Sequence, residues 1–303
     1  MKLDSSAGEL CTVVIPTHNR EKLVPRAIRS IQAQTYSAWE LVVVDDASKD
    51  ATTEAVRPFL VDPRIRYFRQ PTNAGAAAAR NFGASQARGR YITFLDSDDE
   101  GQPTWLARMM DAIERSEAPL ACCGLSEFDV SGRHILTRIP SDMGALFDHA
   151  TAQLTHGSDY VVEKRIFDAV GGFDEALRSG QHTELALRLI PYLLERNSKI
   201  ANVFEPLITV HIHGGARIRT DWEAMFQGHA RAVQKHRRQF QKDPRMLSNY
   251  LSIAAVCGVR TSRLGEARRL FREAAMAYPR RPILWMRLAL AQLPIVPSLV
   301  WRA

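Results

Sequence analysis

The sequence predicts an α/β fold built on a mostly parallel sheet. Continuous apolar runs, such as those at 11–16 and 39–44, are typical of strands buried on both faces. Segments with apolar residues at helical spacing follow these runs along the chain. Strands that alternate with helices form βαβ units with right-handed crossovers. Ligands bind such sheets beyond the carboxyl ends of the strands, so polar residues there are the first candidates for a functional site.

The elements of this pattern can be placed in order along the first part of the chain. We expect strands at 11–17, 39–45, 64–70 and 91–95, with helices between them at 21–34, 51–60 and 73–87. The helix at 21–34 carries its apolar residues at Leu23, Ala27, Ile28 and Ile31, which lie on one face. A further helix is expected at Trp105–Glu117.

The pattern changes after this helix. Residues 119–139 alternate and break at "VSGR", which predicts a hairpin or two β segments. A Gly-rich loop then runs into an amphipathic helix at 171–195, and a last strand follows at 205–215. Only helices are expected from Asp221 onward. We therefore expect an α/β domain at 1–215 and a helical extension at 216–303.

The helical extension is strongly basic. Residues 216–303 hold 17 Lys/Arg and 5 Asp/Glu, a net charge of +12, and the chain total of +7 leaves −5 for residues 1–215. Such a surface suits a membrane or an anionic partner, although a solvated helical surface rich in arginine explains it equally well. Residues 263–293 have the spacing of a tetratricopeptide-type helix pair. One pair cannot form a solenoid, so we expect it to cap the main domain or to dock a partner.

Composition excludes several classes of protein. The chain is 46% hydrophobic and 24% charged, as in soluble globular proteins. Its four cysteines lack metal-ligand spacing, and no secretory signal or run of 18 apolar residues occurs, so we expect a cytoplasmic protein. There is no Gly-x-Gly-x-x-Gly after the first strand and no Gly-x-Ser-x-Gly elbow, which argues against a dinucleotide oxidoreductase and an α/β-hydrolase. Nothing beyond the basic tail indicates nucleic-acid binding.

The strand at Tyr91–Leu95 ends in the acidic stretch "DSDDE" at 96–100. Carboxylates are the ligands that Mg²⁺ and Mn²⁺ favour, and side chains at i and i+2 of an extended segment face the same way. Asp96 and Asp98 could therefore share one cation. The alternative is an acidic loop, and Asp99 and Glu100 are expected at the start of the next helix, where its dipole would favour them.

Four motifs in a fixed order carry a resemblance to a known family. They are "VVIPTHNR", "VVVDDASKDAT", "NAGAAAARNFGASQARGRYITFLDSDD" and "GGFDE". Together they resemble the inverting GT-A glycosyltransferases of family 2, over about residues 10–215. The resemblance implies the GT-A fold, a mostly parallel mixed sheet flanked by helices. It also implies a nucleoside-diphosphate sugar as donor and Mn²⁺ or Mg²⁺ as cofactor.

The resemblance also assigns the donor site. His18 occupies a place where the family often has an aromatic residue against the base, and Asp46, with Asp45 beside it, corresponds to the acid that reads the pyrimidine. Gly75 would permit close approach of the backbone, and Arg80 would offer donors to phosphate oxygens. The residues implied to bind the nucleotide sugar are Pro16, Thr17, His18, Asn19, Arg20, Asp45, Asp46, Asn73, Gly75, Arg80, Asp96 and Ser97.

The implied metal ligands are Asp96, Asp98 and His213, with His211 on the same strand face as a weaker candidate. The catalytic base is where this sequence departs from the family. The family usually has a Glu-Asp pair at the head of the helix after "GGFDE", whereas this chain has Gln181 and His182. Three readings stay open: His182 as the base, a shifted base at Glu184 or Asp174, and weak or absent transferase activity.

The function implied is metal-dependent transfer of a sugar, with inversion, from a UDP-sugar to an acceptor hydroxyl. The acceptor would be a glycan or a lipid-linked glycan of surface polysaccharide synthesis, and the basic helices would contact the inner membrane face. Two alternatives belong to other classes. One is a nucleotide-sugar-binding adaptor without turnover, and the other is a nucleotidyltransferase on a similar sheet.

Overall fold

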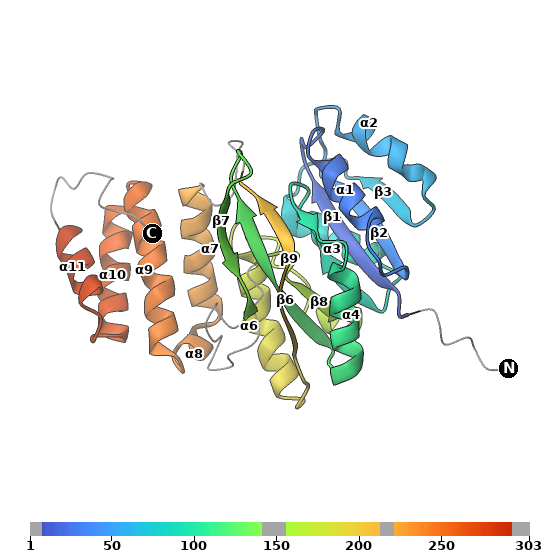
Figure 1. Ribbon diagram of the computed structural model, residues 1–303. Helices are drawn as coiled ribbons and strands as arrows, with labels where there is room; N and C mark the ends of the chain where they lie inside the picture. Colours follow the sequence, from blue (N-terminus) through green and yellow to red (C-terminus); the bar gives the residue numbers. More distant parts are fainter. Residues whose placement is uncertain (1–7, 141–155, 213–220, 293–303) are drawn as a thin grey trace. The chain divides into compact units, whose positions relative to one another are not determined.

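The computed structural model describes residues 8–140, 156–212 and 221–292 (Figure 1). The chain forms two compact units, each of which is described by itself. The first unit comprises Met1–Glu175 and His182–Gly214, and the second comprises Ala176–Gln181 and Gly215–Ala303.

A single mixed sheet organises the first unit. Its strands run in the order β3-β2-β1-β4-β8-β6-β9-β5, and β7 pairs with β6 off this path. Strands β1–β4 are mutually parallel where they pair, and β6 and β9 are also parallel, whereas β8, β5 and β7 pair antiparallel with their neighbours. The strand bounds are β1 (Cys11–Thr17), β2 (Trp39–Asp45), β3 (Ile65–Arg69), β4 (Tyr91–Phe94), β5 (Glu100–Gly101), β6 (Leu120–Phe128), β7 (His134–Arg138), β8 (Tyr160–Glu163) and β9 (Ala201–His211).

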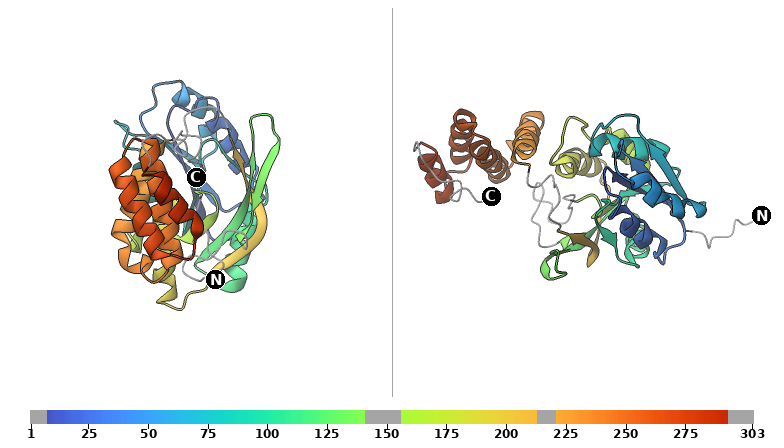
Figure 2. Two further views of the ribbon diagram at one scale, coloured as in Figure 1. Left: turned by 90° about the vertical axis from the view of Figure 1, so that its left-hand side faces the viewer. Right: turned by 90° about the horizontal axis from the view of Figure 1, so that it is seen from above.

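Helices cover both faces of this sheet (Figure 2). One face packs on the apolar sides of α1 and α4 in a core that includes Trp39 and Trp105. The opposite face packs on α3, where a Cβ at Gly83 would lie 2.3 Å from Val14 Cγ1 and 3.2 Å from Val44 Cγ2. Glycine at 83 therefore lets α3 approach β1 and β2 closely. The helices are α1 (Val24–Gln32), α2 (Thr52–Val56), the 3₁₀ helix η1 (Arg57–Val61), α3 (Ala76–Gln86), α4 (Trp105–Ser116), α5 (Lys164–Ala169) and α6 (Gln181–Leu194).

The strands β1–β4 and helices α1, α3, α4 and α6 form where the sequence predicts them, which confirms the α/β fold class. The helix expected at 51–60 is divided into α2 and η1 near Pro58, which has no N–H group to continue the α-helical hydrogen bonds, although Arg57 before it keeps helical dihedrals. The expectation that Asp99 and Glu100 begin a helix is wrong. Glu100 belongs to β5, which pairs with β9, and α4 begins only at Trp105.

Within 221–292, the described residues of the second unit form helices, as predicted. Its helices are α7 (Trp222–Lys235), α8 (Arg237–Phe240), α9 (Pro244–Arg260), α10 (Leu264–Ala277) and α11 (Pro282–Leu290). Helix α9 packs between α7 and α10, and α11 packs on α10 (Figure 1). Among the described residues, no helix is long and apolar enough to cross a membrane.

Candidate active site

The carboxyl ends of β1, β2 and β4 meet at one edge of the sheet, as their parallel pairing requires. Asp45, at the end of β2, is fully buried and accepts hydrogen bonds from Tyr67 Oη (2.6 Å) and the Ser48 N–H (2.8 Å). Burial and this bond raise the pKa of Tyr67 to about 12. Asp45 therefore connects the end of β2 to β3 and to the loop that follows β2.

The carboxylate of Asp46 holds the loop before α3. Its two oxygens accept the backbone N–H groups of Ala74 and Gly75, each at 2.7 Å. Gly75 has φ +92° and ψ 164°, a conformation that is essentially restricted to glycine, and a Cβ there would meet nothing within 4 Å. The glycine is thus explained by backbone geometry. Asn73, two residues earlier, is exposed at the mouth of this loop.

The loop after β1 is tied to the loop after β2. The Asn19 N–H donates to Ser48 Oγ (2.9 Å), and the Lys49 N–H donates to Asn19 Oδ1 (2.7 Å). His18 Nδ1 lies 2.6 Å from the carbonyl oxygen of Asp46. Thr17, which follows Pro16 at the end of β1, has a buried Oγ1 with no hydrogen-bond partner in the part of the chain that the structure describes. A ligand oxygen or N–H could satisfy it.

Arg80 of α3 reaches the end of β4. The side chain is only 6% exposed, and its Nη2 donates to Asp96 Oδ1 at 2.5 Å. Burial alone would raise the pKa of Asp96, but Arg80 and the histidines 156 and 182 outweigh it and hold that pKa well below its usual range. Asp96 is therefore a carboxylate at any physiological pH.

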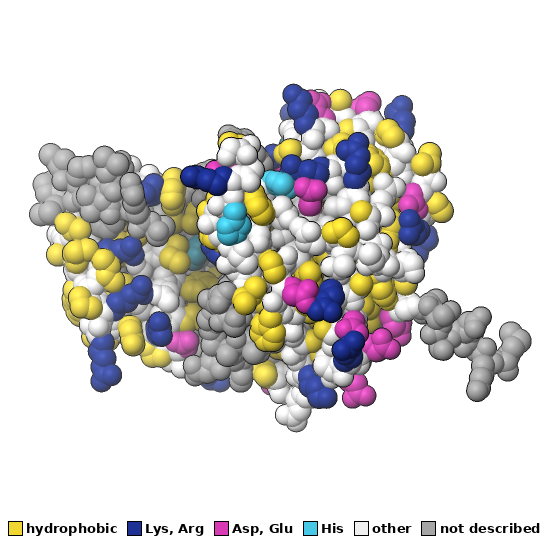
Figure 3. Space-filling model, viewed as in Figure 1, with side chains coloured by type: hydrophobic (Ala, Val, Ile, Leu, Met, Phe, Trp, Pro, Cys, Tyr) yellow, Lys and Arg dark blue, Asp and Glu magenta, His cyan; other side chains and the backbone are white. Residues whose placement is uncertain are grey.

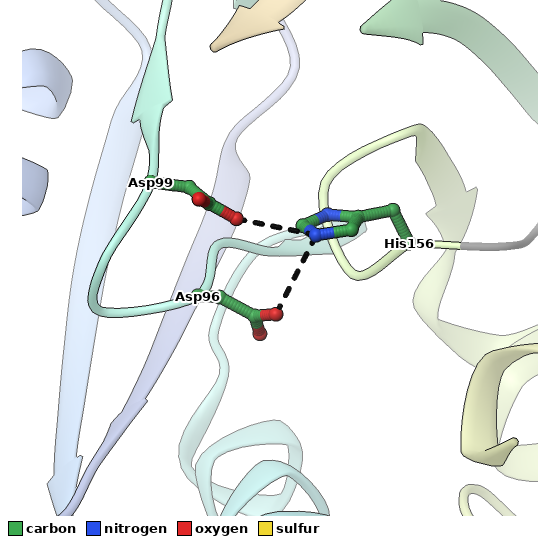
Figure 4. A group of neighbouring side chains, drawn as sticks. All are labelled: Asp96, Asp99 and His156. Carbon is green, nitrogen blue, oxygen red and sulfur yellow. Dashed lines mark ion pairs between the residues drawn. The ribbon is translucent and has the colours of Figure 1, made fainter. Parts of the chain in front are cut away.

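The acidic stretch folds into a turn, closed by a hydrogen bond from the Asp99 N–H to the Asp96 carbonyl (3.0 Å). A shared direction for the Asp96 and Asp98 side chains requires an extended backbone, but residues 96–99 form a turn instead. Asp96 and Asp99 converge on His156, whose Nε2 lies 3.8 Å from Asp96 Oδ2 and 3.2 Å from Asp99 Oδ2 (Figure 4). The Asp98 carboxylate lies instead 3.8 Å from Arg20 Nη2. Ser97, which lies between Asp96 and Asp98 in the sequence, is buried.

We call Asp96, Asp99 and His156 the strand-end cluster. One ligand atom from each residue lies within 4.8 Å of the others. Two carboxylates and an imidazole are a donor set that fits Mn²⁺ well and Mg²⁺ through its oxygens. The residues present therefore fit the cation that the resemblance implies.

Of the two histidines predicted at the last strand, His211 and His213, the structure describes only His211. His211 Nε2 lies 2.6 Å from Glu100 Oε1, and the His211 N–H donates to Asp99 Oδ1 at 3.2 Å, so this residue supports the acidic turn from β9. His213, the predicted metal ligand, lies outside the described residues.

His182 stands in the first turn of α6 between two aromatic rings. Its ring centroid lies 5.0 Å from that of Phe173 and 6.1 Å from that of Tyr160, both edge to face. Both ring nitrogens are buried, and neither has a hydrogen-bond partner among the described residues. Burial and the nearby Arg80 hold the pKa of this imidazole well below its usual value, although Asp96 opposes the shift. His182 is therefore neutral at pH 7.

Gly157 shows how close His182 and the strand-end cluster are. A Cβ on residue 157 would lie 3.3 Å from Asp96 Oδ1 and 3.4 Å from His182 Cε1. The carboxylate and the imidazole thus flank the same small residue. A substrate that lies against Gly157 would therefore be close to both the Asp96 carboxylate and the His182 imidazole.

The other two candidate bases are placed differently. Glu184 is fully buried, and both of its oxygens accept hydrogen bonds from Arg188 one turn later in α6, at 2.6 to 3.2 Å. Asp174 is half-buried in the loop before α6. Asn81 of α3 fastens this loop, because its side chain accepts from the Phe173 N–H (2.8 Å) and donates to the Phe173 carbonyl (3.0 Å).

His156 is not among the site residues that the sequence predicts, and Asp99 is expected there at the start of a helix. His156 lies outside the four motifs, and the apolar run of β8 that begins at Tyr160 went unpredicted. That run was the available signal, because a strand there would bring the polar residues before it to the edge of the sheet. The Asp159 carboxylate, which accepts the His156 N–H at 2.9 Å, fixes this segment.

The fold and the acidic strand-end turn define a glycosyltransferase of the GT-A class. TarS of S. aureus, solved in complex with UDP-GlcNAc, superposes with a TM-score of 0.68 at 18% identity, over 92% of this chain and 87% of that one. The mannosyltransferase PcManGT from Pyrobaculum calidifontis, solved with GDP-Man and Mn²⁺, gives 0.62 at 18% identity over 98% and 84%.

The family model described as "Glycosyl transferase family 2" matches residues 12–168, and the chain belongs to this family. It is 34% identical over 183 residues to the succinoglycan biosynthesis protein ExoO of Rhizobium meliloti, covering 56% of this chain and about half (52%) of that protein. It is also 26% identical over 246 residues to the putative colanic acid biosynthesis glycosyl transferase WcaA of Escherichia coli, covering 77% and 83%.

Proposed function

We propose that this protein transfers a sugar from a UDP-sugar to an acceptor hydroxyl with inversion, and that the transfer requires Mn²⁺ or Mg²⁺. The donor class is supported by TarS, solved with UDP and UDP-GlcNAc, and by PcManGT, solved with GDP-Man and Mn²⁺. Relatives that act in succinoglycan and colanic acid biosynthesis support a glycan or lipid-linked glycan of a surface polysaccharide as acceptor. The basic C-terminal helices support work at the inner membrane face.

The observation that carries this proposal is the pairing of the strand-end cluster with His182. A Cβ on residue 157 would lie within 3.4 Å of both Asp96 and His182, so a diphosphate bound through a cation at Asp96 would place its sugar near the imidazole. Displacement at a sugar carbon with inversion needs a leaving-group stabiliser and a proton acceptor within reach of one substrate. A cation held by the strand-end cluster and the His182 imidazole would fill these two roles.

On the donor side, residues of the sheet edge bind and orient the nucleotide. The buried hydroxyl of Thr17 would bond to the nucleoside, and Arg80 would orient the diphosphate while it holds Asp96. Asp46 keeps the glycine turn in place, so the backbone before α3 can lie against the ligand. A cation held by Asp96, Asp99 and His156 would supply positive charge for the departing nucleoside diphosphate.

On the acceptor side, His182 would take the proton of the attacking hydroxyl. Its imidazole is neutral, and its ring nitrogens have no hydrogen-bond partner among the described residues, so an incoming hydroxyl would have an acceptor at once. Once protonated, the imidazolium would be stabilised by the Asp96 carboxylate, which already raises its pKa. Phe173 and Tyr160 fix the ring in position and exclude water.

The second candidate function is an adaptor that binds a nucleotide sugar without turnover. The observation that favours it is the low pKa of His182, since a weaker base gives less rate. A nucleotidyltransferase would differ from both, because it releases pyrophosphate from a nucleoside triphosphate.

The test measures nucleoside diphosphate released from UDP-glucose, UDP-galactose, UDP-GlcNAc and GDP-mannose, with Mn²⁺ or with a chelator. We expect release from a UDP-sugar that depends on the cation and is lost in Asp96→Asn. Asp168→Asn, an exposed carboxylate paired with Lys164 on α5, is the matched control and should retain activity. Stabilisation by UDP and Mn²⁺ without any release would favour the adaptor. Release that ignores the cation would contradict the proposed mechanism.

A further inference from the structure

The outer face of α11 is apolar and exposed. Pro282, Trp285, Met286 and Ala289 are all exposed and follow the spacing i, i+3, i+4 and i+7 of one helix face. Trp285 is 46% exposed and Met286 is 51% exposed. We call these four residues the α11 stripe. The opposite face of α11 carries the fully buried Leu284 together with Arg287, whose guanidinium donates to Ser252 Oγ at 2.9 Å.

A helix with apolar residues on both faces is typical of a helix that is covered on both sides. Within the second unit, α10 packs on α11 and accounts for the inner face. The indole N–H of Trp285 donates to the Pro279 carbonyl at 3.0 Å, so the ring can enter an apolar layer without leaving its donor unsatisfied. The stripe is therefore suited to an apolar partner.

The chain segment that contains the stripe is basic and holds no acidic residue after Glu273. Arg280 and Arg281 directly precede α11 and are exposed. Figure 3 shows apolar and basic side chains beside one another over the C-terminal helices. The chain from Arg280 to the end of α11 therefore carries positive charge only.

The few acids of the second unit are already engaged. Glu223 pairs with Arg263, and Glu273 pairs with Arg237, each at 2.6 Å. The remaining three have local roles: Asp221 and Asp243 cap α7 and α9, and Glu266 pairs with Arg263 at 3.0 Å. The net charge of +12 for residues 216–303 already counts these five acids, so the segment holds no further carboxylate side chain to reduce it.

We propose that the α11 stripe docks on a membrane surface rich in anionic phospholipid. Arginines beside an apolar stripe match the two layers of such a surface, because guanidinium groups bind phosphate oxygens and the apolar side chains enter the acyl boundary. Tryptophan at the border of the stripe is the residue type that membrane interfaces favour. The stripe belongs to the second unit, whereas every residue of the proposed transfer site belongs to the first, so the inference goes beyond the transfer reaction.

Charge also decides against a second copy of this chain as the occupant. Two α11 stripes brought together would place Arg280 and Arg281 of both copies at one interface, with no acid after Glu273 to offset them. An anionic lipid surface would instead attract Arg280 and Arg281.

The experiment is co-sedimentation of the full chain with phosphatidylcholine vesicles that contain none or 30% phosphatidylglycerol, without donor or metal. We expect binding to the anionic vesicles only, and weakening at high salt. Trp285→Ala with Met286→Ala should reduce partitioning by about tenfold or more. Arg280→Gln with Arg281→Gln should reduce it by roughly fivefold per arginine.

Matched variants of the first unit serve as controls. Phe204 is 59% exposed on β9 and Arg57 is exposed on η1, so Phe204→Ala and Arg57→Gln should leave partitioning unchanged. Equal binding to both vesicle types, or no binding to either, would overturn the proposal. A dimer in sedimentation velocity that disappears in the Trp285/Met286 variant would assign the stripe to a copy of the chain and overturn it as well.

Discussion

Replacement of His182 by alanine separates catalysis from folding in this protein. A general base contributes about 10² to 10⁴ in rate, so kcat should fall by that factor. The donor should bind as before, because neither ring nitrogen bonds to a described residue and the proposed nucleotide contacts lie on β1, β2 and α3. His182→Asp, which restores the residue type that the resemblance places at the base, should recover part of the rate.

The same structure predicts a small effect of His182→Ala on stability. The variant loses two edge-to-face contacts, worth about 0.5–1.5 kcal/mol each, with Phe173 and Tyr160. It also removes two buried nitrogens without partners among the described residues, and each unsatisfied group costs about 1–3 kcal/mol. The lost contacts sum to about 1–3 kcal/mol and the relieved nitrogens to about 2–6 kcal/mol, so urea unfolding, measured beside kcat from nucleotide release, should show no loss of stability above about 1 kcal/mol.

The lowered pKa of His182 predicts how kcat and the free energy of unfolding depend on pH. The folded pKa of His182 lies well below 6.5, so the base stays neutral and kcat should be flat from pH 8 to 6. Below pH 6.5 the unfolded chain binds a proton that the folded chain does not, so stability should fall there by about 1.4 kcal/mol per pH unit. His182→Ala should lack this component. The reasoning is refuted if the alanine variant keeps its kcat, or if it loses UDP binding in proportion to kcat.

Three further predictions concern other parts of the site. Gly75→Ala should cost about 1–3 kcal/mol in urea unfolding through backbone strain alone, since its Cβ would meet nothing; unchanged stability would contradict this. Arg188→Met should cost about 3–5 kcal/mol because it removes the guanidinium that neutralises the buried Glu184 carboxylate, and adding Glu184→Gln should recover most of it; an additive loss in the double variant would speak against the pair. His156→Ala should weaken Mn²⁺ binding, followed by electron paramagnetic resonance without donor, by about tenfold or more, whereas equal affinity would remove His156 from the metal site.

Much of the fold could be predicted from the sequence, because the apolar runs of β1, β2 and β4 allow few other structures. Their parallel pairing brings Thr17, Asp46 and Asp96 to one edge, as the strand-end argument requires. The two-residue strand β5 could not be predicted, since its only signal is a pairing with β9, more than a hundred residues later. Long-range pairing of this kind leaves no local period in the sequence.

Within the site, sequence reasoning located the acids but not their directions. Asp96 and Asp98 were paired because extended residues alternate, whereas the turn at 96–99 pairs Asp96 with Asp99 instead. His156 reaches the same point from a segment with no motif of its own. Side-chain direction in a turn depends on backbone dihedrals that residue types alone do not fix.

The two hydrogen bonds between the Asn81 side chain and the Phe173 backbone have a consequence for the order of substrate binding. One amide side chain joins the helix that begins at the proposed diphosphate site to the loop that carries Phe173, against which His182 packs. A donor that shifts α3 would carry this loop with it and so shape the acceptor pocket. We therefore expect an ordered sequence of substrate addition, with the nucleotide sugar first, and random addition in Asn81→Ala. Product inhibition by UDP, competitive with the donor only, would report this order in the wild-type protein.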